Sequence, residues 1–202
     1  MTEAIAIRRD KSLVLVHDVV NHFVAGGDRE LASVLSNISA LLAAARGAGW
    51  PIVFATPGQG DPAIAPRGEA GKLAWGSKGC EVPNLLMPRP DETIMRKPRY
   101  GAFFGSGLEA HMRRCGADTL ILCGISLAGG VETTVRDAHN RDLGTVLVAD
   151  ACLCRPIPDQ GWGAASREEV EKVTLSLLAQ RFARIATTAE ICRAMAAASS
   201  PR

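Results

Sequence analysis

Three segments of the chain carry residue types that could do chemistry, and each follows a run of apolar residues. Asp18 comes directly after the apolar run 12–17, Lys97 lies in the basic segment 95–100, and residues 124–130 form a glycine-rich loop. A carboxyl group can act as a general acid or base, a lysine can bind an anion, and loop amides can stabilise an oxyanion or bind a carboxylate. Because the loop matches neither GxGxxG nor GxxxxGK(S/T), it does not predict a nucleotide site.

Each segment also has a purely structural interpretation. Asp18 could cap a helix or pair with a buried cation, and the cations around Lys97 could form a solvated edge. Pro98 disfavours a helix at Lys97 and holds it extended. The loop could be a plain tight turn, so position alone leaves the functional and structural readings open.

The elements that must position these residues alternate along the chain. Short apolar runs predict strands at 12–17, 51–55, 92–95, 119–123, 145–149 and 184–186, while helical spacing predicts helices at 29–46, 107–115, 129–140, 166–178 and after 187. This alternation predicts a single α/β domain over residues 1–202, a three-layer sandwich with a mostly parallel, doubly wound sheet. Ligands bind such sheets beyond the carboxyl ends of the strands, where all three segments fall. The proline- and glycine-rich stretch 56–90 is expected to cover the site.

Composition excludes several classes of protein. The chain has 202 residues, of which 47% are apolar and 22% charged, and its net charge is +2. It can therefore build a core, and it lacks the basic surplus of a nucleic-acid-binding protein. No apolar run reaches the roughly 18 residues of a membrane helix. Residues 1–10 lack the apolar stretch of a signal peptide, so we expect a cytoplasmic protein without membrane or nucleic-acid partners.

The six cysteines do not predict a metal site or a disulfide scaffold. Cys152 and Cys154 form a CxC pair, but no second pair or histidine cluster lies near them in the sequence. We expect buried, reduced thiols that pack as small apolar side chains, and we expect no metal.

Taken together, the segments resemble the isochorismatase-like (cysteine hydrolase) superfamily. The resemblance rests on LVHDVVNHF at 15–23, KPRYGAFF at 97–104, the stretch 124–138 with its GVETTVRDA, and VADAC at 148–152, and it runs from about 13 to 186. Most members are amidases with an Asp-Lys-Cys triad. The resemblance carries the first two over to Asp18 and Lys97, but it places the nucleophile at Gly130. A glycine cannot be a nucleophile, so covalent catalysis is not expected.

One branch of the superfamily, the isochorismatases and related phenazine-pathway enzymes, also has glycine at that position. Its members cleave the enolpyruvyl ether of isochorismate or 2-amino-2-deoxyisochorismate. The resemblance then makes Asp18 a general acid that must hold a proton near neutral pH, which apolar walls would favour. Phe23 and Phe104 are expected to contribute to these walls, together with Val16, Val20 and Phe103. Lys97 would bind a substrate carboxylate or orient the acid, and no cofactor is implied.

The same resemblance suggests the remaining substrate contacts. Arg67 stands where the branch has a substrate-binding arginine, and Tyr100 belongs to the matched segment. Thr56 replaces the usual glutamine, and Ser126 replaces the usual tyrosine. These departures weaken isochorismate itself more than vinyl-ether cleavage in general. The implied ligand is a small, carboxylate-bearing molecule.

Two other functions remain open. The first is a non-covalent amide or imide hydrolase that uses water activated by Asp18. The second is a catalytically silent binding subunit, which the retention of both Asp18 and Lys97 argues against, because a buried ion pair is costly to keep. The resemblance also implies a homodimer or homotetramer.

Overall fold

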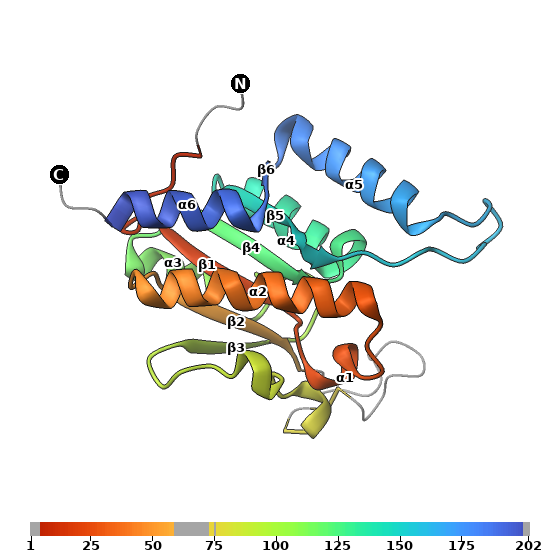
Figure 1. Ribbon diagram of the computed structural model, residues 1–202, viewed down its shortest axis with the longest axis horizontal. Coiled ribbons are helices and arrows are strands. Elements are labelled where there is room, and N and C mark those ends of the chain that lie inside the picture. The colour runs from red at the N-terminus through yellow and green to blue at the C-terminus, as the bar shows by residue number, and fades with distance from the viewer. Residues whose placement is uncertain (1–4, 59–72, 75, 200–202) are drawn as a thin grey trace.

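The computed structural model describes residues 5–58, 73–74 and 76–199, and its centre is a six-stranded sheet (Figure 1). Every strand pairing is parallel, and the strands lie in the order β3-β2-β1-β4-β5-β6. Their bounds are β1 Ser12–His17, β2 Ile52–Pro57, β3 Thr93–Lys97, β4 Thr119–Ile125, β5 Gly144–Leu153 and β6 Arg184–Ala186. The predicted α/β class with a doubly wound parallel sheet is confirmed.

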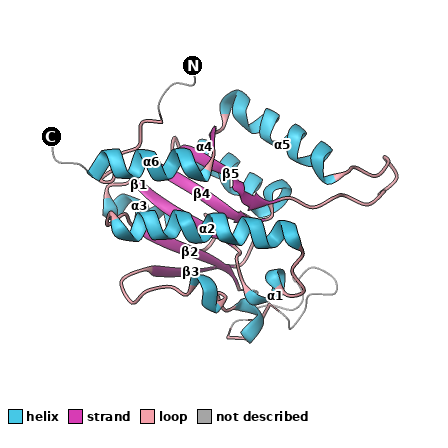
Figure 2. Cartoon of the chain, viewed as in Figure 1, coloured by secondary structure: helices cyan, strands magenta, loops and turns pink. Residues whose placement is uncertain are grey.

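Helices cover both faces of the sheet, as Figure 2 shows. One face packs against α2 (Arg29–Gly47) and α6 (Thr188–Ser199), and the other against α3 (Leu108–Cys115), α4 (Glu132–His139) and α5 (Arg167–Arg181). The alternation along β1 explains the two layers, since Val14 and Val16 join the first cluster while Leu13 and Leu15 join the second. A strand that is buried on both sides is expected to be mainly apolar, and β1 is apolar over residues 13–16, between Ser12 and His17 at its ends. In the described part of the chain, no helix is both long and apolar enough to cross a membrane.

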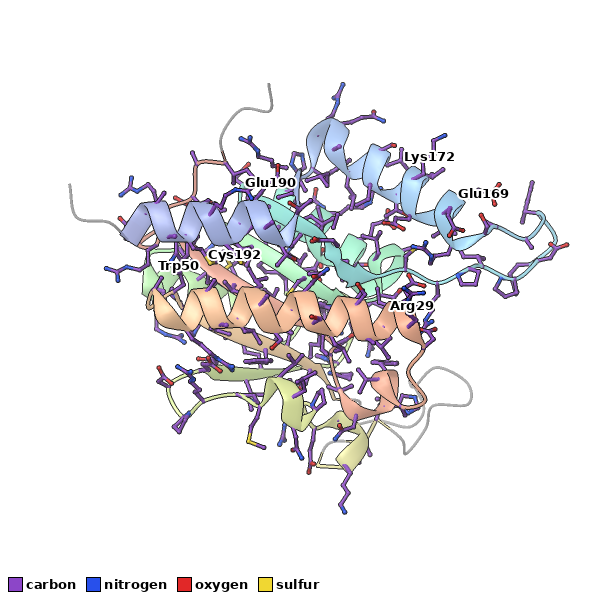
Figure 3. All side chains as sticks on the ribbon, viewed as in Figure 1. Arg29, Trp50, Glu169, Lys172, Glu190 and Cys192 are labelled. Carbon is purple, nitrogen blue, oxygen red and sulfur yellow. The ribbon has the colours of Figure 1, made fainter. Side chains whose placement is uncertain are left out.

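Two predicted helix starts, at 166 and after 187, are confirmed by their caps. Ser166 and Glu169 form a capping box at the start of α5, with Ser166 N donating to Glu169 Oε2 at 2.8 Å. Thr187 and Glu190 form the same reciprocal pair before α6. Figure 3 labels Glu169 and Glu190 at these two helix starts. The caps satisfy backbone amides that would otherwise lack partners.

The boundaries near the carboxyl edge differ from the prediction. β3 and β4 run two residues further, so Lys97 and Ile125 are the last residues of their strands rather than loop residues. A π-helical segment, Leu127–Val131, precedes α4, because Gly129 has non-helical dihedral angles (φ −152°, ψ −113°). A short helix α1, Asn21–Val24, was not predicted, and 3₁₀ turns lie at Lys78–Cys80 and Asn84–Leu86 in the described part of the stretch 56–90.

The cysteine prediction is correct in part. Cys123, Cys152 and Cys154 are buried, and all six described thiols are free. Cys115 is exposed, which corrects the expectation of uniform burial. It lies in the last turn of α3, where the helix faces solvent before Gly116 ends it in the left-handed conformation.

The strand order creates a crevice at one place. From β1 the chain moves to β2 and β3 on one side, and it then returns to β4 on the other side of β1. The connections therefore leave the carboxyl ends of β1 and β4 in opposite directions. In doubly wound sheets this switch point is where ligands bind.

Candidate active site

Asp18 and Lys97 meet at the carboxyl edge of the sheet. Lys97 Nζ donates to Asp18 Oδ2 at 2.7 Å, and the side chains are 2% and 11% exposed, Lys97 first. Asp18 follows β1 and Lys97 ends β3, and these two strands are not neighbours because β2 lies between them. The register pairs His17 with Ala55 and Pro57 with Lys97, so the parallel ladder brings the two predicted residues into contact.

The two carboxylate oxygens of Asp18 have different surroundings. Oδ2 accepts from Lys97, whereas Oδ1 is buried and has no hydrogen-bond partner among the described residues. The backbone holds the residue in the left-handed region at φ 52°, which aspartate tolerates better than most side chains. Its amide donates to Ala55 O at 2.8 Å. One carboxylate oxygen is thus anchored and the other is left for a proton or a ligand.

Lys97 is held by a second acceptor. Its Nζ also donates to Arg99 O at 3.0 Å, across Pro98. An ammonium group has three N–H donors, and these two contacts use two of them. The third can serve a bound anion.

A pocket of about 300 Å³ includes this ion pair in its lining. It brings together six of the predicted site residues: Asp18, Lys97, Gly130, Phe23, Tyr100 and Ser126. The other lining residues are Pro57, Leu73, Pro98, Arg99, Ile125, Gly129 and Arg155. The contribution of Leu73 agrees with the expectation that part of the stretch 56–90 covers the site.

Two predicted substrate contacts lie outside this lining. Thr56 is buried in β2, where its Oγ1 donates to Met95 O at 3.5 Å. Phe104 is exposed, and the Arg99 guanidinium lies 5.8 Å from its ring centre. Arg67 falls outside the described residues, so its role stays a prediction.

His17 precedes Asp18 in the chain and contacts its carboxylate, and it was not predicted as a site residue. It is the last residue of β1 and is fully buried. Its Nδ1 lies 3.0 Å from Ile125 O and 3.5 Å from Asp18 Oδ2, and its Nε2 lies 2.9 Å from Tyr100 O. Burial lowers the pKa of the imidazole, Lys97 lowers it further, and Asp18 with the two carbonyls acts in the opposite direction.

Two glycines make room for His17. A Cβ on Gly124 would lie 2.7 Å from His17 N, and Gly124 has φ +133°, which favours glycine. A Cβ on Gly130 would collide with the His17 ring, with Nε2 at 2.9 Å, and would also lie 2.9 Å from Tyr100 O. Gly124 therefore leaves space for the backbone of His17, and Gly130 leaves space for its ring.

Two arginines in the lining were also missed. Arg99 Nη1 donates to Pro98 O at 2.9 Å, and Arg155, just beyond β5, forms an ion pair with Asp28. Both stand at the carboxyl edge. Asp18 and Lys97 were identified because polar residues at the carboxyl ends of parallel strands are site candidates. The same rule would have identified Arg155 if the end of β5 had been predicted at Leu153.

The buried thiols near the sheet are poor nucleophiles. Burial raises the pKa of Cys123 to about 12, and burial likewise raises the pKa of Cys152. No cysteine is among the described lining residues. In the described ranges, no three His, Cys, Asp or Glu side chains gather in a way that could hold a metal ion.

Comparison with known proteins gives consistent similarities. The family model of the isochorismatase domain matches residues 12–190. A "Probable isochorismatase" of Pseudomonas chlororaphis is 31% identical over 193 residues, covering 92% of this chain and 87% of that protein. A ureidoacrylate amidohydrolase of Methylobacterium radiotolerans is 29% identical over 180 residues, covering 74% and 69%. The crystal structure of a cysteine hydrolase from Pseudomonas syringae pv. phaseolicola superimposes with a TM-score of 0.90 at 28% identity, covering 98% and 100%.

Proposed function

The chain belongs to the isochorismatase family and is a hydrolase, and on this premise we propose that it cleaves a carboxylate-bearing enolpyruvyl (vinyl) ether by acid catalysis. The observation that carries the proposal is the asymmetry of Asp18. One of its oxygens binds Lys97, and the other is buried without a described partner in a residue that lines the pocket. Isochorismate and 2-amino-2-deoxyisochorismate are the candidate substrates.

The reaction begins with a proton transfer. Asp18, as a carboxylic acid, gives the proton on Oδ1 to the terminal methylene carbon of the enolpyruvyl group. An oxocarbenium ion then forms at the carbon that bears the ether oxygen. Water adds to this carbon, and its surplus proton returns to Asp18. The hemiketal collapses as its hydroxyl proton passes to the leaving oxygen, which releases pyruvate and an alcohol. Water is consumed, the acid is regenerated, and no cofactor is needed.

Lys97 orients the acid in this scheme. When Oδ1 carries the proton, Oδ2 still accepts from the ammonium group, so the acid keeps one orientation. A nearby cation opposes protonation of a carboxylate. A substrate carboxylate bound among Lys97, Arg99 and Arg155 offsets that charge and favours the acid form. Substrate binding and protonation of Asp18 thereby support each other.

The lining favours a reaction without a covalent intermediate. Gly130 stands where the family resemblance places a thiol, and no cysteine is among the described lining residues. The buried thiols of Cys123 and Cys152 hold their protons, since burial raises the pKa of both. Direct proton transfer by Asp18 needs neither of them.

The test is pyruvate release from isochorismate and from 2-amino-2-deoxyisochorismate, which is measured through a coupled reaction that oxidises NADH. We expect release by the wild type and a fall in kcat of about 10³-fold in Asp18→Asn, because general acid catalysis contributes about 10²–10⁴-fold. Asparagine keeps an acceptor for Lys97 and tolerates the left-handed backbone. Asp142→Asn is the matched control, since Asp142 is exposed and has a similar φ of 56°. Full turnover in Asp18→Asn would refute the mechanism.

Amide or imide hydrolysis is the second candidate, favoured by the similarity to an amidohydrolase. Here Asp18 would act as a base that activates water. Absence of pyruvate from both substrates, with turnover of a small ureido or amide substrate that Asp18→Asn abolishes, would select this function instead.

A further inference from the structure

The space that a side chain at position 130 would need is already occupied. A Cβ there would meet the His17 ring, with Nε2 at 2.9 Å, and the carbonyl oxygen of Tyr100, also at 2.9 Å. Contacts this close force something to shift. The ring of His17 therefore lies where a residue at 130 would project its first side-chain atom.

The ring cannot easily turn away from that position. Its two nitrogens lie 3.0 Å and 2.9 Å from the carbonyl oxygens of Ile125 and Tyr100, and the residue has no exposed surface. Gly124 packs against its backbone on the neighbouring strand. Because a neutral imidazole has a single N–H, it donates to one of these two carbonyl oxygens, and rotation would break that hydrogen bond at a cost of about 1–3 kcal/mol.

The same ring connects the segments that border the pocket. Tyr100 belongs to the loop after β3, and Ile125 is the last residue of β4 before Ser126. Tyr100, Ile125 and Ser126 all line the pocket. His17 is also the residue before Asp18, with Nδ1 at 3.5 Å from the Asp18 carboxylate. A change in this ring would be transmitted to the acid and to both loops.

We propose that His17 determines which kind of chemistry this pocket performs. Its imidazole takes the place of a nucleophilic side chain at position 130, and it positions Asp18 and the two loops for catalysis without a covalent intermediate. His17 is a positioning residue and does not itself touch the reacting atoms. The claim about turnover rests on the proposed function, whereas the steric claim does not.

A stability cycle tests the steric claim. We expect Gly130→Ala alone to lower Tm by about 5 °C, because overpacking costs about 1–3 kcal/mol and each kcal/mol shifts Tm by about 2–4 °C in a chain of this size. His17→Ala alone should also lower Tm by about 5 °C, through the cavity left by the ring and the lost hydrogen bond to a carbonyl oxygen. The double variant should lie within about 2 °C of His17→Ala, because the shorter contacts, those with the ring, are then gone and only the contact with Tyr100 O is left. Additive losses of about 10 °C in the double variant would overturn the inference.

A thiol test examines whether the vacated space is a site for a nucleophile. In His17→Ala/Gly130→Cys the introduced sulfur would lie in the lining that contains Lys97, whose charge favours the thiolate. We expect alkylation by iodoacetamide at pH 7, mapped by mass spectrometry, to be at least about tenfold faster than in Gly47→Cys. Gly47 is the matched control because a Cβ there meets nothing within 4 Å. An equal or slower rate in the double variant would contradict the proposal.

Turnover separates positioning from simple structural support. In His17→Ala we expect kcat for pyruvate release to fall about tenfold or more while KM changes less than about threefold, since a misplaced acid slows the chemical step. An unchanged kcat would remove the positioning role. If the wild type releases no pyruvate, the proposed function fails. The stability cycle and the thiol test would still decide the steric claim.

Discussion

Replacing Lys97 with methionine would leave the Asp18 carboxylate buried without the ammonium group that it binds at 2.7 Å. Removing one partner of a buried ion pair costs about 3–5 kcal/mol. Because the Asp18 side chain keeps 11% exposure beside a pocket, we expect the lower end, about 3 kcal/mol. At about 2–4 °C per kcal/mol, Tm should fall by about 9 °C.

A double-mutant cycle shows whether this loss comes from the pair. Asp18→Asn alone keeps an acceptor for the ammonium group but removes the charge that balances it, and it should cost a similar amount of stability. The double variant, Lys97→Met with Asp18→Asn, buries no unpaired charge and should cost less than either single variant, about 1 kcal/mol rather than the summed 6 kcal/mol. Urea denaturation at pH 7 measures each free energy of unfolding. Lys172→Met is the matched control, because Lys172 is exposed on α5 (Figure 3), and it should stay within about 0.5 kcal/mol of the wild type.

Activity provides the second measurement on the same variants. Lys97→Met should lower kcat about 100-fold, since the acid loses its orientation, and it should raise KM because a substrate carboxylate loses a cation. Fully additive stability losses would refute the buried-pair reasoning. Unchanged kinetic constants in Lys97→Met would remove this lysine from the site.

Three further predictions test other contacts. Gly124→Ala should lower stability by about 4 kcal/mol or prevent folding, because its Cβ would lie 2.7 Å from His17 N at φ +133°; a thermal melt close to that of the wild type would contradict this. Glu92→Gln should cost about 2 kcal/mol at pH 7, where Arg46 donates to Glu92 at 2.7 Å and 2.9 Å. Burial raises the pKa of Glu92, but the bonds from Arg46 and from the amide of Arg89 outweigh it and hold the pKa below its usual range. This stabilisation is therefore present above the unfolded value of about 4.3 and is lost as pH falls through the folded value, so melts of variant and wild type should converge in acid and not at pH 7. Arg155→Gln should raise KM about tenfold with kcat nearly unchanged, and an unchanged KM would show that this lining residue does not bind substrate.

The order and type of most elements followed from local patterns. A strand buried on both faces, such as Ser12–His17, has an apolar run at its centre, and a helix such as Arg29–Gly47 shows its buried face in its spacing. The capping boxes at Ser166 and Thr187 marked helix starts for the same reason, because each depends on residues only three apart. Strand ends were less predictable. The register shift between Leu122 and Gly124 arises from contacts between β4 and β5, which no local pattern contains.

The position of Asp18 and Lys97 at one edge of the sheet was predictable, because polar side chains at the carboxyl ends of parallel strands share that edge. Their 2.7 Å contact was not, since it depends on β2 lying between β1 and β3 in a particular register. The lining role of Arg155 likewise depends on how far β5 runs.

Local patterns in the sequence predict the layered α/β architecture and the sheet edge at which Asp18 and Lys97 lie, and the sequence shows that position 130 carries no thiol. What occupies the space at that position depends on the tertiary structure. His17 and Gly130 belong to segments far apart in the chain, and they meet because β1 and β4 are neighbours at the switch point of the sheet. Local periodicity follows from interactions within a few residues. The packing of the His17 ring against Gly130 depends instead on strand order, register and close packing.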